Sequence, residues 1–222
     1  MLFVASFFIE LLIIFLLSRH ITRQLSFIFY RITKNKKATI YCMAFLFFPG
    51  TLIHELSHYL AAHLLFVRVS HMEFIPRLEG THVKLGSVSI ERTDPIRRLL
   101  IGAAPFAFGT SLLLGGLYNA ARYDLFNNTF FLILIGYFVF EISNTMFSSR
   151  KDMGGALELS IISLLLIGIF YFFSINLPFS LELNTVISNP TLVKVFEKGS
   201  IFLLIPLGIN SLTIIIFKLL RL

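Results

Sequence analysis

Long apolar runs are the feature that most limits how this chain can fold. Six of them occur, at about residues 2–18, 39–66, 98–118, 129–148, 155–175 and 199–219. A helix needs about 20 predominantly apolar residues to cross the hydrocarbon core of a bilayer. The sequence therefore predicts an all-α polytopic membrane protein with about six transmembrane helices.

The composition agrees with this class of protein and argues against others. Of the 222 residues, 56% are hydrophobic and 14% are charged, whereas an ordinary soluble domain is about 25% charged. The formal net charge of +7 indicates loop residues near anionic headgroups rather than nucleic-acid binding. We expect a multi-pass integral protein of the cell membrane. Its expected partners are the lipid bilayer and a membrane-protein or peptide substrate, with no nucleic acid.

The chain divides into three parts. Residues 1–38 hold the first span and a basic connecting segment at 19–37. The first span lacks the basic start and cleavage site of a signal peptide, so we expect it to be retained. Residues 39–160 form a three-span core with a polar insertion at about 67–97, and residues 161–222 contribute the C-terminal spans.

The insertion carries a β-hairpin pattern. In HVKLGSVSIE, residues 82–91, apolar positions alternate on either side of a Gly-Ser pair, which predicts two strands joined by a two-residue turn. The sequence TDPIRRLL follows, in which Pro95 suits the first turn of a helix and Thr93 or Asp94 can cap it. The third span should therefore begin there.

The side of the membrane on which each loop lies follows from counting crossings. If every run crosses once, the basic segment 19–37 and the insertion 67–97 lie on opposite sides. Lys and Arg then nearly balance between the two sides, so the positive-inside rule assigns no orientation. The segment 19–37 also contains LSFIFY, and part of it is expected to lie flat at the interface as an amphipathic helix.

The second run contains the pattern H-E-x-x-H, formed by His54, Glu55 and His58. On a helix the two histidines lie on the same face, about 40° apart around the axis, where they can hold one zinc ion. Glu55 is placed beside them to act as a general base. His63 is about 180° from His54 and is excluded. The alternative is a histidine–glutamate cluster satisfied by neighbouring helices, although ionisable residues in spans are usually functional.

A catalytic zinc site takes three protein ligands, so a third must come from elsewhere in the chain. Asp152 follows the fourth run and has a glycine pair close by, which permits a tight turn. Its alternative role is to cap the fifth helix. Glu141, in the fourth run, could orient a histidine or serve as a substitute third ligand. Glu158 could serve similarly, and Glu10 is expected to be a paired interior residue.

These residues resemble the site-2 proteases, a family of intramembrane zinc metalloproteases, over about residues 45–160. In that family H-E-x-x-H lies in one span, and a stretch that often reads N-x-x-P-x-x-x-x-D-G follows two spans later. Asn144 and Asp152 have the family spacing, while Phe147 stands at the proline position and DMGG replaces Asp-Gly. The resemblance implies one zinc ion per chain with His54, His58 and Asp152 as its ligands, Glu55 as the base and Asn144 as a contact to substrate or to the active-site backbone.

The resemblance also implies an activity, which is hydrolysis of peptide bonds in or near transmembrane segments of membrane proteins. The insertion is then expected to dip into the membrane and pair with an extended substrate. Two alternatives remain open: a membrane zinc metallopeptidase that acts on soluble peptides, and a non-proteolytic zinc-binding membrane protein. Glu55 distinguishes the last of these, because a carrier needs ligands but no base beside them.

Overall fold

The first helix, α1 (Leu2–Thr33), is almost twice as long as the apolar run that predicted it. The computed structural model describes residues 2–73, 77–79, 82–84, 87–147, 152 and 189–220. Helix α1 has 32 residues, or about 48 Å at 1.5 Å per residue. Its buried positions recur every three or four residues through the basic segment: Phe7, Leu11, Ile14, Ser18, Ile21, Leu25 and Ile28. The expected interfacial helix within 19–37 is therefore wrong, because the buried stripe continues α1 to Thr33.

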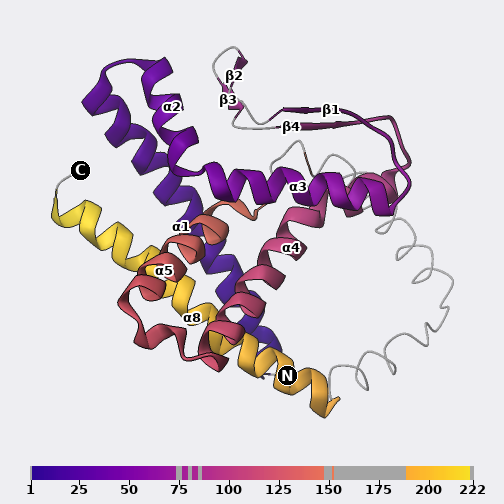
Figure 1. The fold of residues 1–222 in the computed structure, drawn as a ribbon, viewed down its shortest axis with the longest axis vertical. Helices are drawn as coiled ribbons and strands as arrows, with labels where there is room; N and C mark the ends of the chain where they lie inside the picture. The colour runs from indigo at the N-terminus through magenta and orange to yellow at the C-terminus, as the bar shows by residue number, and fades with distance from the viewer. Residues whose placement is uncertain are drawn as a thin grey trace, which may run out of the picture.

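The second apolar run is not one straight span. It forms α2 (Lys36–Leu46) and α3 (Phe48–Leu64), which are bent by 73° at the break between them. Pro49 lies in the first turn of α3. Proline has no backbone N–H and cannot continue the ladder of a preceding helix, but it is well accommodated in a first turn. The histidine pair therefore lies on a helix that runs across the bundle (Figure 1).

The insertion forms four short strands, but their pairing differs from the predicted hairpin. Strand β1 (Val69–Glu73) pairs antiparallel with β4 (Ser87–Ile90), and β2 (Arg77–Glu79) pairs with β3 (His82–Lys84). The prediction that 82–85 pairs with 88–91 is therefore wrong. Val69 and Ile90 pack together against a small core that includes Ala62 and Ile101. Packing of this partly buried pair favours the observed register, which a local turn pattern does not specify.

The third span begins where the sequence predicted. Helix α4 (Pro95–Arg122) has Asp94 as its N-cap, and the Asp94 side chain accepts a hydrogen bond of 2.9 Å from the Arg97 N–H. This bond, together with the Arg97 charge, lowers the pKa of the Asp94 carboxyl. The short helix η1 (Leu125–Asn127) leads into α5 (Thr129–Thr145), and α8 (Pro190–Leu219) is the last helix.

The helices indicate a membrane protein but do not establish six membrane crossings. Within the described residues, α1, α4 and α8 are each long and apolar enough to cross a membrane, and the bent pair α2–α3 meets the same test as a unit. Helix α5 has 17 residues and is shorter. The predicted fifth run, 155–175, lies outside the described residues. The chain is an all-α membrane protein with a small β insertion.

Helices α1 and α8 lie side by side and run in the same direction (Figure 1). Phe7 contacts Phe196 near the start of both helices, and Ile21 shares a cluster with Ile214 nearer their ends. Six single crossings would make the first and last spans antiparallel. The prediction of sides therefore fails, because the bent pair α2–α3 does not cross as one straight helix.

This arrangement gathers the positive charge at one end of the bundle. The end of α1 and helix α2 lie on the same side as the strands (Figure 1). Among the described Lys and Arg residues, Arg122, Lys194 and Lys198 belong to the end where α1 and α8 begin, and the others lie toward the opposite end. The near balance of charge expected from sequence is therefore wrong.

Candidate metal centre

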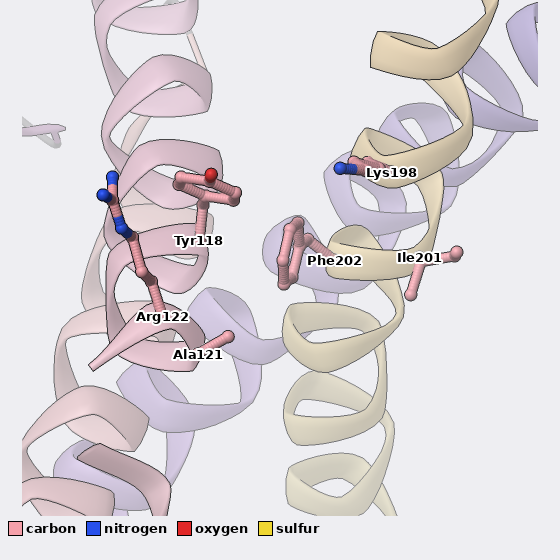
Figure 2. A pocket seen from close by; sticks show the side chains of 6 residues that line it. All are labelled: Tyr118, Ala121, Arg122, Lys198, Ile201 and Phe202. Carbon is pink, nitrogen blue, oxygen red and sulfur yellow. The ribbon is translucent and has the colours of Figure 1, made fainter. Parts of the chain in front are cut away.

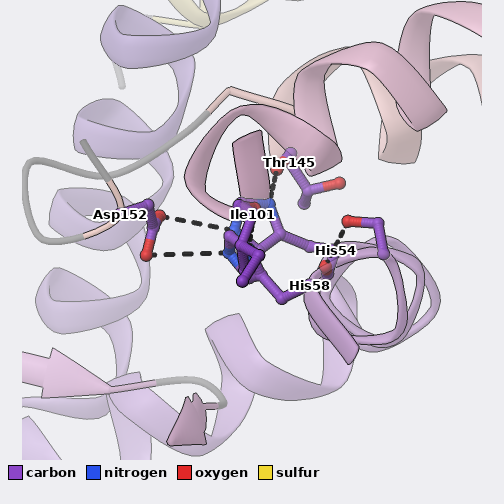
Figure 3. Close-up of polar contacts among 6 residues, drawn as sticks. His54, His58, Ile101, Thr145 and Asp152 are labelled. Carbon is purple, nitrogen blue, oxygen red and sulfur yellow. Dashed lines mark hydrogen bonds and ion pairs between the residues drawn. The ribbon is translucent and has the colours of Figure 1, made fainter. Parts of the chain in front are cut away.

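The two histidines of α3 have the orientation that metal ligands require. Their ring centroids are 4.9 Å apart. Nδ1 of His54 lies 2.7 Å from the carbonyl oxygen of Thr145 at the end of α5, and Nδ1 of His58 lies 2.8 Å from that of Ile101 in α4 (Figure 3). A carbonyl oxygen can only accept, so each Nδ1 carries the hydrogen. In a neutral imidazole this leaves Nε2 with a free lone pair.

Asp152 faces both of these lone pairs. Its Oδ2 lies 3.6 Å from His54 Nε2, and its Oδ1 lies 3.6 Å from His58 Nε2 (Figure 3). One ligand atom from each residue lies within 4.8 Å of the others. The buried His58 Nε2 has no hydrogen-bond partner, and 3.6 Å exceeds the length of a hydrogen bond. His54, His58 and Asp152 therefore form a group that could hold a metal ion.

A glycine of α4, Gly102, lets the backbone of Asp152 approach that helix closely, next to the histidines. A Cβ atom added at Gly102 would overlap the carbonyl oxygen of Asp152 and lie 2.8 Å from its carbonyl carbon. Only glycine lets the two backbones approach this closely. Gly102 directly follows Ile101, whose carbonyl holds His58. Nothing in the sequence around Gly102 indicates this role, because it depends on a segment fifty residues later, and the alternative role of Asp152 as a helix cap depends on residues outside the described ones.

Glu55 lies beside the group, as expected from its place in the motif. Its side chain is buried, and its carboxylate interacts electrostatically with His54, His58 and Asp152. It also interacts with the backbone N–H of Val88 in β4. A strand of the insertion therefore contacts the residue predicted to be the base. His63, excluded from the site by its helical position, is exposed.

Glu141 supports α3 rather than contacting a histidine ring. It is fully buried, and its Oε2 accepts a hydrogen bond of 3.2 Å from the N–H of Gly50. Gly50 lies in the first turn of α3, where the N-cap residue Phe47 provides no side-chain acceptor. Glu141 thus caps α3 from the neighbouring helix, one turn before His54, and a carboxylate there also suits the positive end of the helix dipole. It lies outside the three-residue metal group.

Asn144, in α5, forms hydrogen bonds to α1 and α8 next to the site. Its side chain donates to Asn210 Oδ1 at 2.9 Å, and its backbone oxygen accepts from Ser18 Oγ at 3.1 Å. It directly precedes Thr145, whose carbonyl holds His54. This network positions the end of α5, while the predicted contact of Asn144 with substrate stays a prediction.

Glu10, the carboxylate of the first span, has a partner at the contact between α1 and α8. Glu10 Oε1 accepts a hydrogen bond of 2.6 Å from Ser200 between α1 and α8, which agrees with the expected paired interior residue. Glu158 lies outside the described residues.

The chain was compared with protein-family models, curated proteins and solved structures, and none of them matches it. Its class therefore follows from its own residues. It is a membrane protein in which two histidines of a bent helix and one aspartate could hold a metal ion.

Proposed function

We propose that the chain is an intramembrane zinc endopeptidase that hydrolyses peptide bonds in or near transmembrane segments of other membrane proteins. One observation carries this proposal. Two imidazole Nε2 atoms and a carboxylate converge within 4.8 Å of one another, and the buried carboxylate of Glu55 lies beside them. Such a set of lone pairs repels itself unless a cation or protons lie between them.

Zinc is the metal that this ligand set fits best. His54, His58 and Asp152 would hold the ion, one per chain. Two imidazoles and one carboxylate are a set used by catalytic zinc, which keeps a further position open. Magnesium and calcium favour oxygen ligands. The two backbone carbonyls that accept from Nδ1 resemble the outer partners that orient histidine ligands in metal sites.

Each residue of the site would have its own role in the proposed hydrolysis. A bound zinc ion would supply Lewis acidity, which polarises a carbonyl and lowers the pKa of water. Glu55 would take the proton from the attacking water and pass it to the leaving amine. The Val88 N–H holds the Glu55 carboxylate in place. His54 and His58 would donate their Nδ1 hydrogens to the carbonyls of Thr145 and Ile101, which leaves both Nε2 atoms to face the ion.

The first test measures zinc per chain in detergent-purified protein. We expect about one zinc ion in the wild type and loss of zinc in both His54→Ala and Asp152→Ala. His63→Ala is the matched control on the same helix and should keep its zinc, because His63 is exposed and outside the group. No zinc in the wild type after metal supplementation would contradict the proposal.

The second test separates a peptidase from a zinc-binding protein without catalysis. Glu55→Gln should keep its zinc and lose cleavage of single-span model peptides in detergent, followed by mass spectrometry. Cleavage of soluble peptides alone would identify the alternative metallopeptidase. Bound zinc with no cleavage that depends on Glu55 would identify a non-proteolytic protein.

We further propose that β4 receives the unwound substrate segment by strand addition. Its main chain already reaches Glu55 through Val88. Main-chain donors alternate in direction along a strand. The Glu91 N–H donates to the Arg68 carbonyl on the β1 side, so the Ile90 N–H faces away from β1, and Ile90→Pro removes this donor. We expect this variant to keep its zinc and cleave slowly, while Ile90→Ala, which loses the same packing against Val69 but retains the donor, cleaves faster. Equal rates for the two variants would contradict strand addition.

A further inference from the structure

A groove between α4 and α8 lies at the end of the bundle remote from the metal group (Figure 2). Its volume is about 480 Å³, which is within the range of about 300–1,000 Å³ typical of small-molecule sites. Its lining residues come from the last turns of α4 and from α8: Tyr118, Ala121, Arg122, Lys198, Ile201 and Phe202.

The lining combines two cations with an apolar wall. Arg122 and Lys198 are both exposed and come from opposite helices; Lys198 points toward α4, while the Arg122 guanidinium points away from α8 (Figure 2) and lies 5.9 Å from the centre of the Tyr123 ring. Within the described part of the chain, neither forms an ion pair with a carboxylate. Ile201 and Phe202 provide apolar surface next to them. A ligand that fits must carry negative charge at one end and an apolar chain at the other.

The distribution of charge makes this pair unusual for its location. Arg122, Lys194 and Lys198 are the described Lys and Arg residues of this end of the bundle, which also carries the acids Asp124 and Glu197. Two of the three cations line the groove, and neither acid does. The groove also lies between two helices that are each apolar enough to cross a membrane. The surrounding bilayer is thus the immediate source of an amphiphilic ligand.

We propose that this groove binds a phospholipid with an anionic headgroup. The phosphate binds at Lys198, the exposed Arg122 side chain turns from Tyr123 to meet it, and one acyl chain follows Ile201 and Phe202 along α8. A guanidinium suits a phosphate because it donates two parallel hydrogen bonds, and an ammonium adds a point charge.

The test uses the absence of tryptophan from this chain. Phe202→Trp places a single fluorescent indole in the groove. The protein is reconstituted in phosphatidylcholine vesicles that contain either brominated phosphatidylglycerol or brominated phosphatidylcholine, and quenching gives the relative affinity of the two lipids. Each surface cation contributes roughly a fivefold preference for an anionic lipid. We expect about a 5- to 25-fold preference for phosphatidylglycerol.

Two variants in the Phe202→Trp background make the test specific. Arg122→Gln combined with Lys198→Gln should reduce the preference to near one. Lys36→Gln combined with Lys37→Gln removes the same charge from the opposite end of the bundle and should leave the preference unchanged. No preference in the parent, a preference that survives the groove variant, or an equal loss in both variants would overturn the proposal.

Discussion

Replacing Gly102 by alanine should weaken metal binding by moving Asp152. The added Cβ would overlap the carbonyl oxygen of Asp152 and lie 2.8 Å from its carbonyl carbon. The atoms that it meets belong to the backbone, so no side-chain rotation relieves the overlap. Overpacking of this kind typically costs about 1–3 kcal/mol.

This cost should appear in metal affinity more than in folding. Without metal, Asp152 can move away from α4 and relieve the strain. Metal binding requires its carboxylate to return to the two Nε2 atoms, which now lie 3.6 Å from it. Because a factor of ten in affinity corresponds to about 1.4 kcal/mol, a strain of 1–3 kcal/mol weakens binding by about 5- to 150-fold.

The assay is competition for zinc against a chromophoric chelator in detergent, with thermal unfolding of the metal-free protein in parallel. Gly116→Ala is the matched control on the same helix, because a Cβ there meets no atom within 4 Å. It should bind zinc like the wild type. Asp152→Asn, which keeps the backbone unchanged, should also weaken binding. Wild-type affinity in Gly102→Ala would refute the close approach of Asp152 to α4 as the basis of the site.

Further predictions concern the cap, the orientation and the start of α4. Glu141→Ala leaves a buried N–H of α3 without its acceptor, so unfolding in detergent should show a loss of about 1–3 kcal/mol, and Glu141→Gln, which retains an oxygen, should lose less. Cys42→Ser removes the one cysteine of the sequence. In that background, the thiol of Lys36→Cys should react with a membrane-impermeant reagent from the cytoplasmic side and that of Asn127→Cys from the other side, because positive residues remain cytoplasmic; the reverse pattern would contradict the orientation. The pKa of Asp94 is lower in the folded than in the unfolded protein. Its contribution to the free energy of unfolding is therefore fully present above the pKa of the unfolded state and is lost as the pH falls through the pKa of the folded state. Asp94→Asn should remove this part of the decrease in stability at acidic pH. If stability falls with pH in the variant as it does in the wild type, the prediction is contradicted.

The membrane class, the histidine pair and the start of α4 could all be predicted from the sequence. These features are local. The length of an apolar run decides whether it can span a bilayer. Residues four apart share a helix face, and an Asp-Pro pair marks a helix start. His54 and His58 therefore lie together in the structure as their spacing predicted, and Asp94 caps α4.

Tertiary structure decided the features that depend on which segments pack together. The 73° bend places α3 across the bundle and gathers the positive charge at one end. Asp152, suggested by its position near a glycine pair, meets histidines more than ninety residues earlier because Gly102 admits its backbone. The carbonyls of Thr145 and Ile101 orient both rings. Every residue carries such a carbonyl, so only the packing of three helices selects the two that hold the site.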